Sequence, residues 1–89
     1  MIVISYDISN NKLRSQFSKF LEQYGYRLQY SVFEIKNSER LLNIICKKIE
    51  GRFAKQFEGG DSVFIFKTNS GSALKFGNAI HHDQPLVIL

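Results

Sequence analysis

The stretch GYRLQYSVFE, residues 25–34, constrains the fold of this chain more than any other part of the sequence. β-Branched and aromatic side chains alternate there with polar ones, and no proline interrupts them, a pattern that predicts β-structure. On extended backbone, one face carries Tyr26, Leu28, Tyr30 and Val32, and the opposite face carries Arg27, Gln29, Ser31 and Phe33. The second set, taken as the outer face, has a cation at one end and an aromatic ring at the other. Because an outer face is normally polar throughout, this mixture indicates contact with another molecule.

Two amphipathic helices are predicted, one on each side of this stretch. The first runs from about residue 12 to residue 24, and its apolar positions have helical spacing: Leu13, Phe17, Phe20, Leu21 and Tyr24. The second begins after the capping pair Asn37-Ser38, and its apolar stripe consists of Leu41, Leu42, Ile45, Ile49 and Phe53. Gly51 weakens the second helix by about 1 kcal/mol relative to alanine, so this helix either ends there or continues unevenly to residue 57.

Three further segments predict strands, at residues 2–8, 61–68 and 85–89, and a polar loop with glycines fills residues 69–84. Two helices that return between the strands of one small sheet favour a ferredoxin-like βαββαβ sandwich of the α+β class, a single domain over residues 1–89. That topology needs a hairpin between the helices, where only eleven residues, 26–36, are available. Either the first arm of the hairpin is very short, or one long bent strand takes the place of both arms.

The composition limits the kind of protein this can be. A net charge of +4 suits a polyanionic partner without identifying one. Cys46 is the only cysteine, so no intramolecular disulfide can form. The start, MIVISYDIS, has no basic leader, and no apolar run approaches the roughly 20 residues of a membrane helix. These features predict a cytoplasmic protein with no membrane contact.

Asp7 is the first candidate for chemistry, because it lies at the carboxyl end of the first predicted strand. A carboxylate there can hold Mg²⁺ or Mn²⁺, since hard cations prefer oxygen ligands. One carboxylate per chain makes a poor site, whereas two copies brought together across a dimer axis make a plausible one. The alternative role is a turn or helix cap, which the spacing alone favours.

Three segments resemble, in the same order, the small CRISPR-associated adaptation protein family, the nuclease-like partner of the CRISPR integrase. They are Tyr6-Asp7-Ile8 with Leu13-Arg14, then GYRLQYSVFE, then Asp61-Ser62-Val63. The resemblance implies the ferredoxin-like fold and a metal-dependent endonuclease site at Asp7 with Mg²⁺ or Mn²⁺. It also associates the matching positions Tyr6, Arg14, Arg27 and Phe33 with cleavage or binding of nucleic acid. Gln16 stands where some relatives carry a second basic residue, which weakens the case for catalysis more than for phosphate binding.

The resemblance further implies a homodimer in which the last strand is exchanged between protomers. That strand comprises Pro85, Leu86, Val87, Ile88 and Leu89. An apolar chain end needs an anchor, and an exposed sheet edge can supply one. For Phe64 and Phe66, packing in the core or at the dimer interface is favoured over stacking on bases.

Basic residues on the two predicted helices and in the central stretch are candidates for nucleic-acid binding: Lys12, Arg14, Lys19, Arg27, Lys47, Lys48 and Arg52. A solvated helical face explains the helical ones about as well. Two functions follow from the resemblance: a metal-dependent endonuclease acting on RNA or DNA, and a dimeric DNA-binding bridge that positions integrase subunits during spacer acquisition. The alternative is a ferredoxin-like dimeric binding module with no nuclease activity and no CRISPR role.

Overall fold

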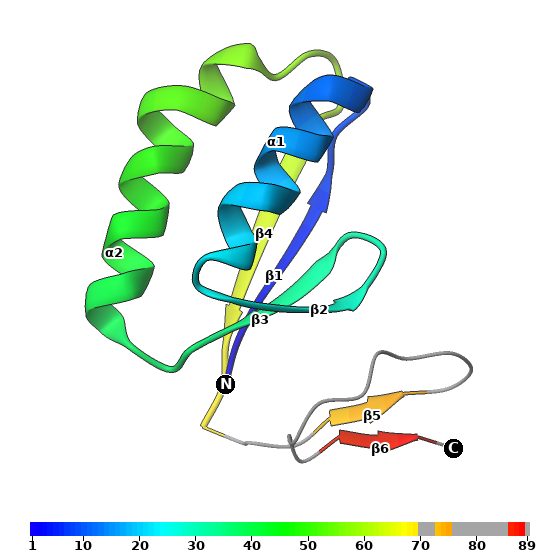
Figure 1. Ribbon diagram of the computed structural model, residues 1–89, viewed down its shortest axis with the longest axis vertical. Coiled ribbons are helices and arrows are strands. Elements are labelled where there is room, and N and C mark those ends of the chain that lie inside the picture. The colour runs from blue at the N-terminus through cyan, green and yellow to red at the C-terminus, as the bar shows by residue number, and fades with distance from the viewer. Residues whose placement is uncertain (70–72, 76–85, 89) are drawn as a thin grey trace.

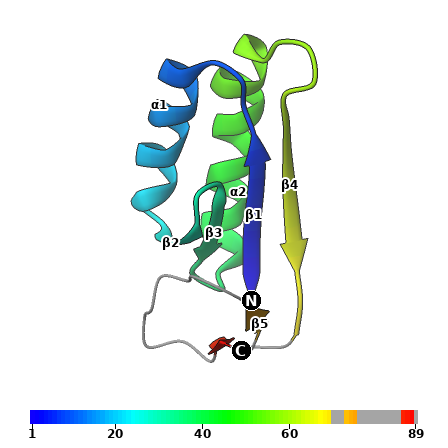
Figure 2. The same cartoon turned by 90° about the vertical axis from the view of Figure 1, so that its right-hand side faces the viewer.

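A four-stranded antiparallel sheet with two α-helices on one face forms the body of the chain (Figures 1 and 2). In the computed structural model, residues 1–69, 73–75 and 86–88 are described. The elements of the body are β1 (Ile2–Asp7), α1 (Asn11–Glu22), β2 (Gly25–Gln29), β3 (Val32–Ile35), α2 (Glu39–Lys48) and β4 (Ser62–Lys67). The strand order β2-β3-β1-β4 is that of the ferredoxin-like α+β sandwich. The predicted fold class is therefore confirmed.

The core lies between the helices and the sheet, and it contains the apolar helical positions that the sequence predicted. Its buried members are Ile2, Ile4, Tyr6, Ile8, Leu13, Phe17, Phe20, Leu21, Phe33, Ile35, Leu42, Ile45 and Phe53, with Ile49 packed against them. Phe17 is at the centre: its ring meets those of Tyr6 and Phe53 edge-on, each at a centroid distance of 5.0 Å. Edge-to-face pairs of this kind stabilise a core beyond the area they bury.

Both helices begin at side-chain caps. Asn10 accepts a hydrogen bond from the Leu13 amide at 2.9 Å, and Ser38 accepts one from the Leu41 amide at 3.3 Å. Past Lys48 the second helix continues as a π-helical turn, η1 (Ile49–Phe53), and a 3₁₀ turn, η2 (Ala54–Gln56). The uneven continuation through Gly51 is therefore the correct one of the two alternatives. The π-turn keeps Phe53 buried in the core.

The central stretch forms a hairpin, not one bent strand. Its arms, β2 and β3, meet at a turn over Tyr30 and Ser31, and the register shifts between Arg27 and Gln29. Arg27 pairs with Phe33, so the two do share a face, as the alternation predicted. The prediction that this face is the outer one was wrong, because Phe33 is fully buried beneath the helices. Arg27 lies at the rim of the sheet, where its charged end can reach the surface of α1.

The sheet face opposite the helices carries an exposed aromatic pair. Phe64 and Phe66 of β4 are 60% and 55% exposed, and their rings stack at 6.2 Å. Packing in the core of this chain, one of the two predicted roles, is therefore wrong for them. Their strand neighbours Val63 and Ile65 point the other way and pack against the core. Packing at a dimer interface stays a prediction.

The C-terminal part forms a separate pair of short parallel strands, β5 (Ala73–Lys75) and β6 (Leu86–Ile88). The strand at residues 86–88 was predicted, but β5 lies inside the predicted loop 69–84, and that assignment was wrong there. Three residues without β-branched side chains carry too little alternation to be recognised as a strand. Pro85 and Leu89 lie outside the described residues, and exchange of this strand between protomers stays a prediction. None of the helices in the described ranges has the length and apolar character to span a bilayer.

Candidate functional site

The end of β1 places the two most important predicted residues on opposite faces of the sheet. Tyr6 points toward the helices and is 4% exposed. Asp7, the next residue, is exposed and pairs with Ser62 of β4, on the face that also carries Phe64. From the sequence we predicted that Asp7 shares one site with Tyr6 and the two arginines. The structure places Asp7 on the opposite face of the sheet from them.

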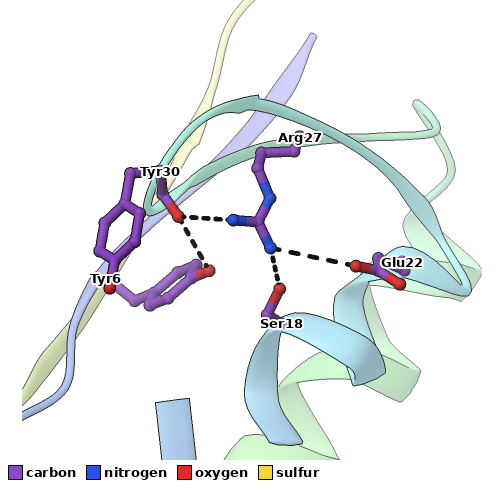
Figure 3. Close-up of polar contacts among 5 residues, drawn as sticks. All are labelled: Tyr6, Ser18, Glu22, Arg27 and Tyr30. Atoms are coloured by element: carbon purple, nitrogen blue, oxygen red, sulfur yellow. Dashed lines mark hydrogen bonds and ion pairs between the residues drawn. The ribbon is translucent and has the colours of Figure 1, made fainter. Parts of the chain in front are cut away.

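Arg27 is held between the hairpin turn and α1 (Figure 3). One guanidinium nitrogen, Nη1, donates to the Tyr30 carbonyl oxygen at 3.2 Å, and Nη2 donates to the Ser18 hydroxyl. The Glu22 carboxylate lies 3.9 Å from Nη2, and the guanidinium stands 5.2 Å from the centre of the Phe33 ring. These contacts come from three elements, so they fix the charge of Arg27 at one place.

Arg14 occupies the other side of the same hollow. Its Nη1 donates to the Ile8 carbonyl oxygen at 2.8 Å, and its Nη2 donates to the Asn11 side chain. The guanidinium lies 5.8 Å from the centre of the Tyr30 ring. Arg14 thus closes the loop between β1 and α1, which is a structural reason for an arginine in the first turn of a helix.

Between the two arginines lies an open pocket of about 240 Å³, lined by Tyr6, Asn11, Arg14, Ser15, Ser18, Arg27 and Tyr30. Its lining contains two guanidinium groups and no carboxylate, and this charge suits an anion such as a phosphate group. Burial raises the pKa of Tyr6 above its ordinary value, although contact with Ser18 and the charge of Arg27 oppose the shift. Like an unperturbed tyrosine, Tyr6 is protonated at neutral pH, and its hydroxyl donates to the Tyr30 carbonyl oxygen at 3.5 Å.

The Asp7 carboxylate is suited to a hard divalent cation as one oxygen ligand, and such a cation needs further ligands beside it. The exposed carboxylate belongs to Asp7, which pairs with Ser62 in the sheet, and it is a suitable oxygen ligand for Mg²⁺ or Mn²⁺. Among the described residues, however, no group of three or more His, Cys, Asp or Glu side chains converges on one point. A metal site shared between two copies therefore stays a prediction, in which each chain would contribute the Asp7 carboxylate.

The family model for the CRISPR associated protein Cas2 matches residues 1–75. The chain belongs to the Cas2 family. This confirms the resemblance drawn from the three sequence segments, all of which lie within the matched range. The family assignment extends over both faces of the sheet described above, including Asp7 and the arginine pocket.

Relatives within the Cas2 family agree with this assignment. The chain is 34% identical over 74 residues to the CRISPR-associated endoribonuclease Cas2 3 of Synechocystis sp., covering 83% of this chain and 76% of that protein. It is 33% identical over 75 residues to the CRISPR-associated endoribonuclease Cas2 of Mycobacterium tuberculosis, covering 84% of this chain but only 63% of that protein. Among solved structures, a hypothetical protein TT1823 from Thermus thermophilus superimposes with a TM-score of 0.72 at 28% identity, covering 90% of this chain and 93% of that one.

The remaining predicted site residues of this Cas2 family chain fall in two groups. Phe33 is a core residue whose ring lies under Arg27, so it shapes the pocket from below and is not open to a substrate. The basic helical residues are exposed and lie apart from the pocket: Lys12, Lys19, Lys47, Lys48 and Arg52. Gln16 faces a second open hollow of about 540 Å³ between the start of α1 and η2, not the arginine pocket.

Sequence reasoning missed three residues that organise this region of the Cas2 fold. Ser18 and Glu22 hold Arg27 from α1, and they could have been found as polar positions four residues apart on one helical face. Asp61 accepts hydrogen bonds from the loop that follows Asp7. Asp61 could have been recognised from its position in the third family segment, directly after a glycine pair.

Proposed function

We propose that this Cas2 family chain acts as a nucleic-acid-binding homodimer with a Mg²⁺- or Mn²⁺-dependent endonuclease site formed by the Asp7 carboxylates of two protomers. The observation that carries the proposal is the end of β1, which presents an exposed carboxylate on one face and leads into a pocket of two fixed arginines on the other. The names of the relatives, which call them endoribonucleases, support phosphodiester hydrolysis.

The exposed aromatic face supports a second copy as the group that completes the site. Phe64 and Phe66 leave an apolar patch on the same sheet face as Asp7, and burying such a patch favours association. Two copies that cover this face around a two-fold axis passing near the end of β1 would bring their Asp7 side chains toward each other. Half-sites on separate chains would then become one site with two carboxylates.

The protein groups have separable tasks in this scheme. When bound, the cation would neutralise phosphate charge and lower the pKa of a coordinated water molecule. Asp7 supplies the anionic oxygens that such a cation requires. Arg14 and Arg27 each have five N–H donors, more than their internal contacts use, and the remaining donors can hold a phosphate. Tyr6 adds a protonated hydroxyl to the pocket, and burial raises its pKa further from the neutral range.

The cellular role that we propose is spacer acquisition, in which the homodimer binds duplex DNA and bridges CRISPR integrase subunits. The exposed basic side chains on α1 and α2 support contact with phosphates, which needs only positive charge at the surface. One observation favours bridging without turnover as the second candidate: the described part of one chain supplies a single exposed carboxylate at the end of β1 and no cluster of metal-ligating residues.

The substitution Asp7→Asn tests the catalytic part, because asparagine keeps the size of the side chain and removes its charge. We expect Mn²⁺-dependent cleavage of RNA and DNA oligonucleotides to fall below one hundredth of the wild-type rate, with an unchanged sedimentation coefficient. Glu50→Gln, which neutralises an exposed carboxylate on η1, serves as the matched control and should cleave normally.

The same variants separate the two candidates in a spacer-acquisition assay with the integrase. Normal acquisition by Asp7→Asn alongside lost cleavage assigns the cellular role to bridging. Cleavage that persists unchanged in Asp7→Asn would show that the activity does not use the proposed site. Loss of acquisition in Asp7→Asn, with the complex still assembled, would instead make catalysis the cellular role.

A further inference from the structure

Asp61 joins two loops that are distant in the sequence. Its Oδ1 accepts hydrogen bonds from the Ser9 amide at 2.9 Å and from the Ser9 hydroxyl at 3.0 Å. Its Oδ2 accepts one from the Glu58 amide at 2.9 Å, and the Asp61 amide donates back to the Glu58 carbonyl oxygen at 2.9 Å. One carboxylate therefore ties the loop after β1 to the turn before β4.

The loop that Asp61 holds is the one that follows Asp7. Only three residues separate Asp7 from the start of α1. Each is fixed from a different direction: Arg14 binds the Ile8 carbonyl oxygen, Asp61 binds Ser9, and Asn10 caps α1. Among these contacts, only the Asp61 contact reaches across to β4, whose Ser62 is the partner of Asp7 in the sheet.

The carboxylate is suited to this task because it is charged over the working pH range. Hydrogen bonds from the Glu58 and Ser9 backbone lower the pKa of Asp61 below its ordinary value. The turn itself depends on Gly59, which has a φ of +51°, a conformation that other residues rarely adopt. Asp61 is thus held in a closed turn and projects its second oxygen onto the β1–α1 loop.

We propose that Asp61 is a positioning residue that fixes the Asp7-bearing end of β1, so that two Asp7 carboxylates can meet at one metal. The functional half of this inference rests on the shared metal site proposed above. Asp61 acts through the backbone of residues 7–10 and has no hydrogen bond to the Asp7 side chain among the contacts of the described residues. Removing a partner that is hydrogen-bonded to a metal ligand typically weakens metal affinity by about 10- to 100-fold, and Asp61, which acts one step further away, should lie at the lower end of that range.

The test compares Asp61→Ala with Gly60→Ala, which adds a methyl group in the same turn without steric conflict and leaves the carboxylate in place. Amide hydrogen exchange and chemical shifts by NMR report on residues 7–10, and a titration with Mn²⁺ alone reports metal affinity by paramagnetic broadening at Asp7. For Asp61→Ala we expect faster exchange at Ser9, shifted signals over residues 7–10, and an about 10-fold weaker Mn²⁺ affinity. Gly60→Ala should retain Mn²⁺ affinity near the wild-type value.

Unchanged signals at residues 7–10 in Asp61→Ala would overturn the inference, as would an equal loss of Mn²⁺ affinity in Gly60→Ala. If Asp61→Ala does not fold, Asp61→Asn, which retains one acceptor oxygen, and Ser9→Ala decide by the same criteria. Failure of the wild-type protein to bind Mn²⁺ at Asp7 would refute the metal site. In that case the exchange and shift data still decide whether Asp61 fixes the loop.

Discussion

Replacing Gly25 with alanine should severely weaken the hairpin that carries Arg27. A Cβ at this position would lie 2.0 Å from the Glu34 carbonyl oxygen and 2.8 Å from the Ile35 Cα. Real Cβ atoms essentially never approach closer than 3.0 Å, so β2 and β3 would have to separate by about 1 Å at this point. Both opposing atoms belong to the backbone of β3, which is itself paired with β1, so neither can move aside without disturbing the sheet.

The expected loss of stability follows from the contacts that Gly25→Ala would disrupt. Separation would weaken about two ladder hydrogen bonds, each worth about 1 kcal/mol, and the residual overlap adds about 1–3 kcal/mol of packing strain. We therefore expect Gly25→Ala to lower the free energy of unfolding by about 3–5 kcal/mol, a large share of the roughly 5–15 kcal/mol of a typical domain. Urea unfolding followed by circular dichroism measures this loss directly.

Gly51→Ala is the matched control, because the same atom is added where it meets nothing. Apart from its chain neighbours and the backbone of its own helix, no atom of the described residues lies within 4 Å of a Cβ at Gly51, and the position is helical. We expect this variant to raise the free energy of unfolding by about 0.5–1 kcal/mol, since alanine loses less backbone entropy on folding than glycine. If Gly25→Ala proves as stable as the wild type within about 1 kcal/mol, β2 and β3 do not approach each other closely at Gly25.

Three further predictions concern the pH response, the basic surface and the C-terminal strand. Burial, together with the Glu34 carboxylate, raises the pKa of Tyr26 to about 12 from 10.0, so its contribution to stability is complete below pH 10 and is lost as the pH rises toward 12. Tyr26→Phe should flatten that decline in urea unfolding curves, and an unaltered slope would contradict the assignment. Reversing the charges of Lys47 and Lys48 should weaken DNA binding and reduce its salt dependence, as measured by fluorescence anisotropy, and unchanged affinity would exclude this face. Deleting residues 86–89 should convert the proposed dimer to monomers or aggregates in sedimentation, whereas a stable truncated dimer would refute strand exchange.

Local patterns in the sequence were enough to place the helices, the core positions and Asp7. The stripe through Leu13, Phe17 and Leu21 predicted which side of α1 is buried, and the capping residues marked where both helices begin. These features depend on neighbours within one or two helical turns, where propensity and periodicity act directly. The three family segments also identified the Cas2 family, because they are contiguous stretches whose order the chain itself records.

The tertiary structure alone decided which face of the hairpin is covered and which groups meet. Alternation showed that Arg27 and Phe33 share a face, but the position of the turn and the packing of α1 determined that this face points inward. Asp61 lies 52 residues from Ser9 in the sequence, and nothing in either local pattern foretells their hydrogen bonds. Periodicity groups residues along one element, whereas contacts between elements arise only when the sheet order and the helix packing bring them together.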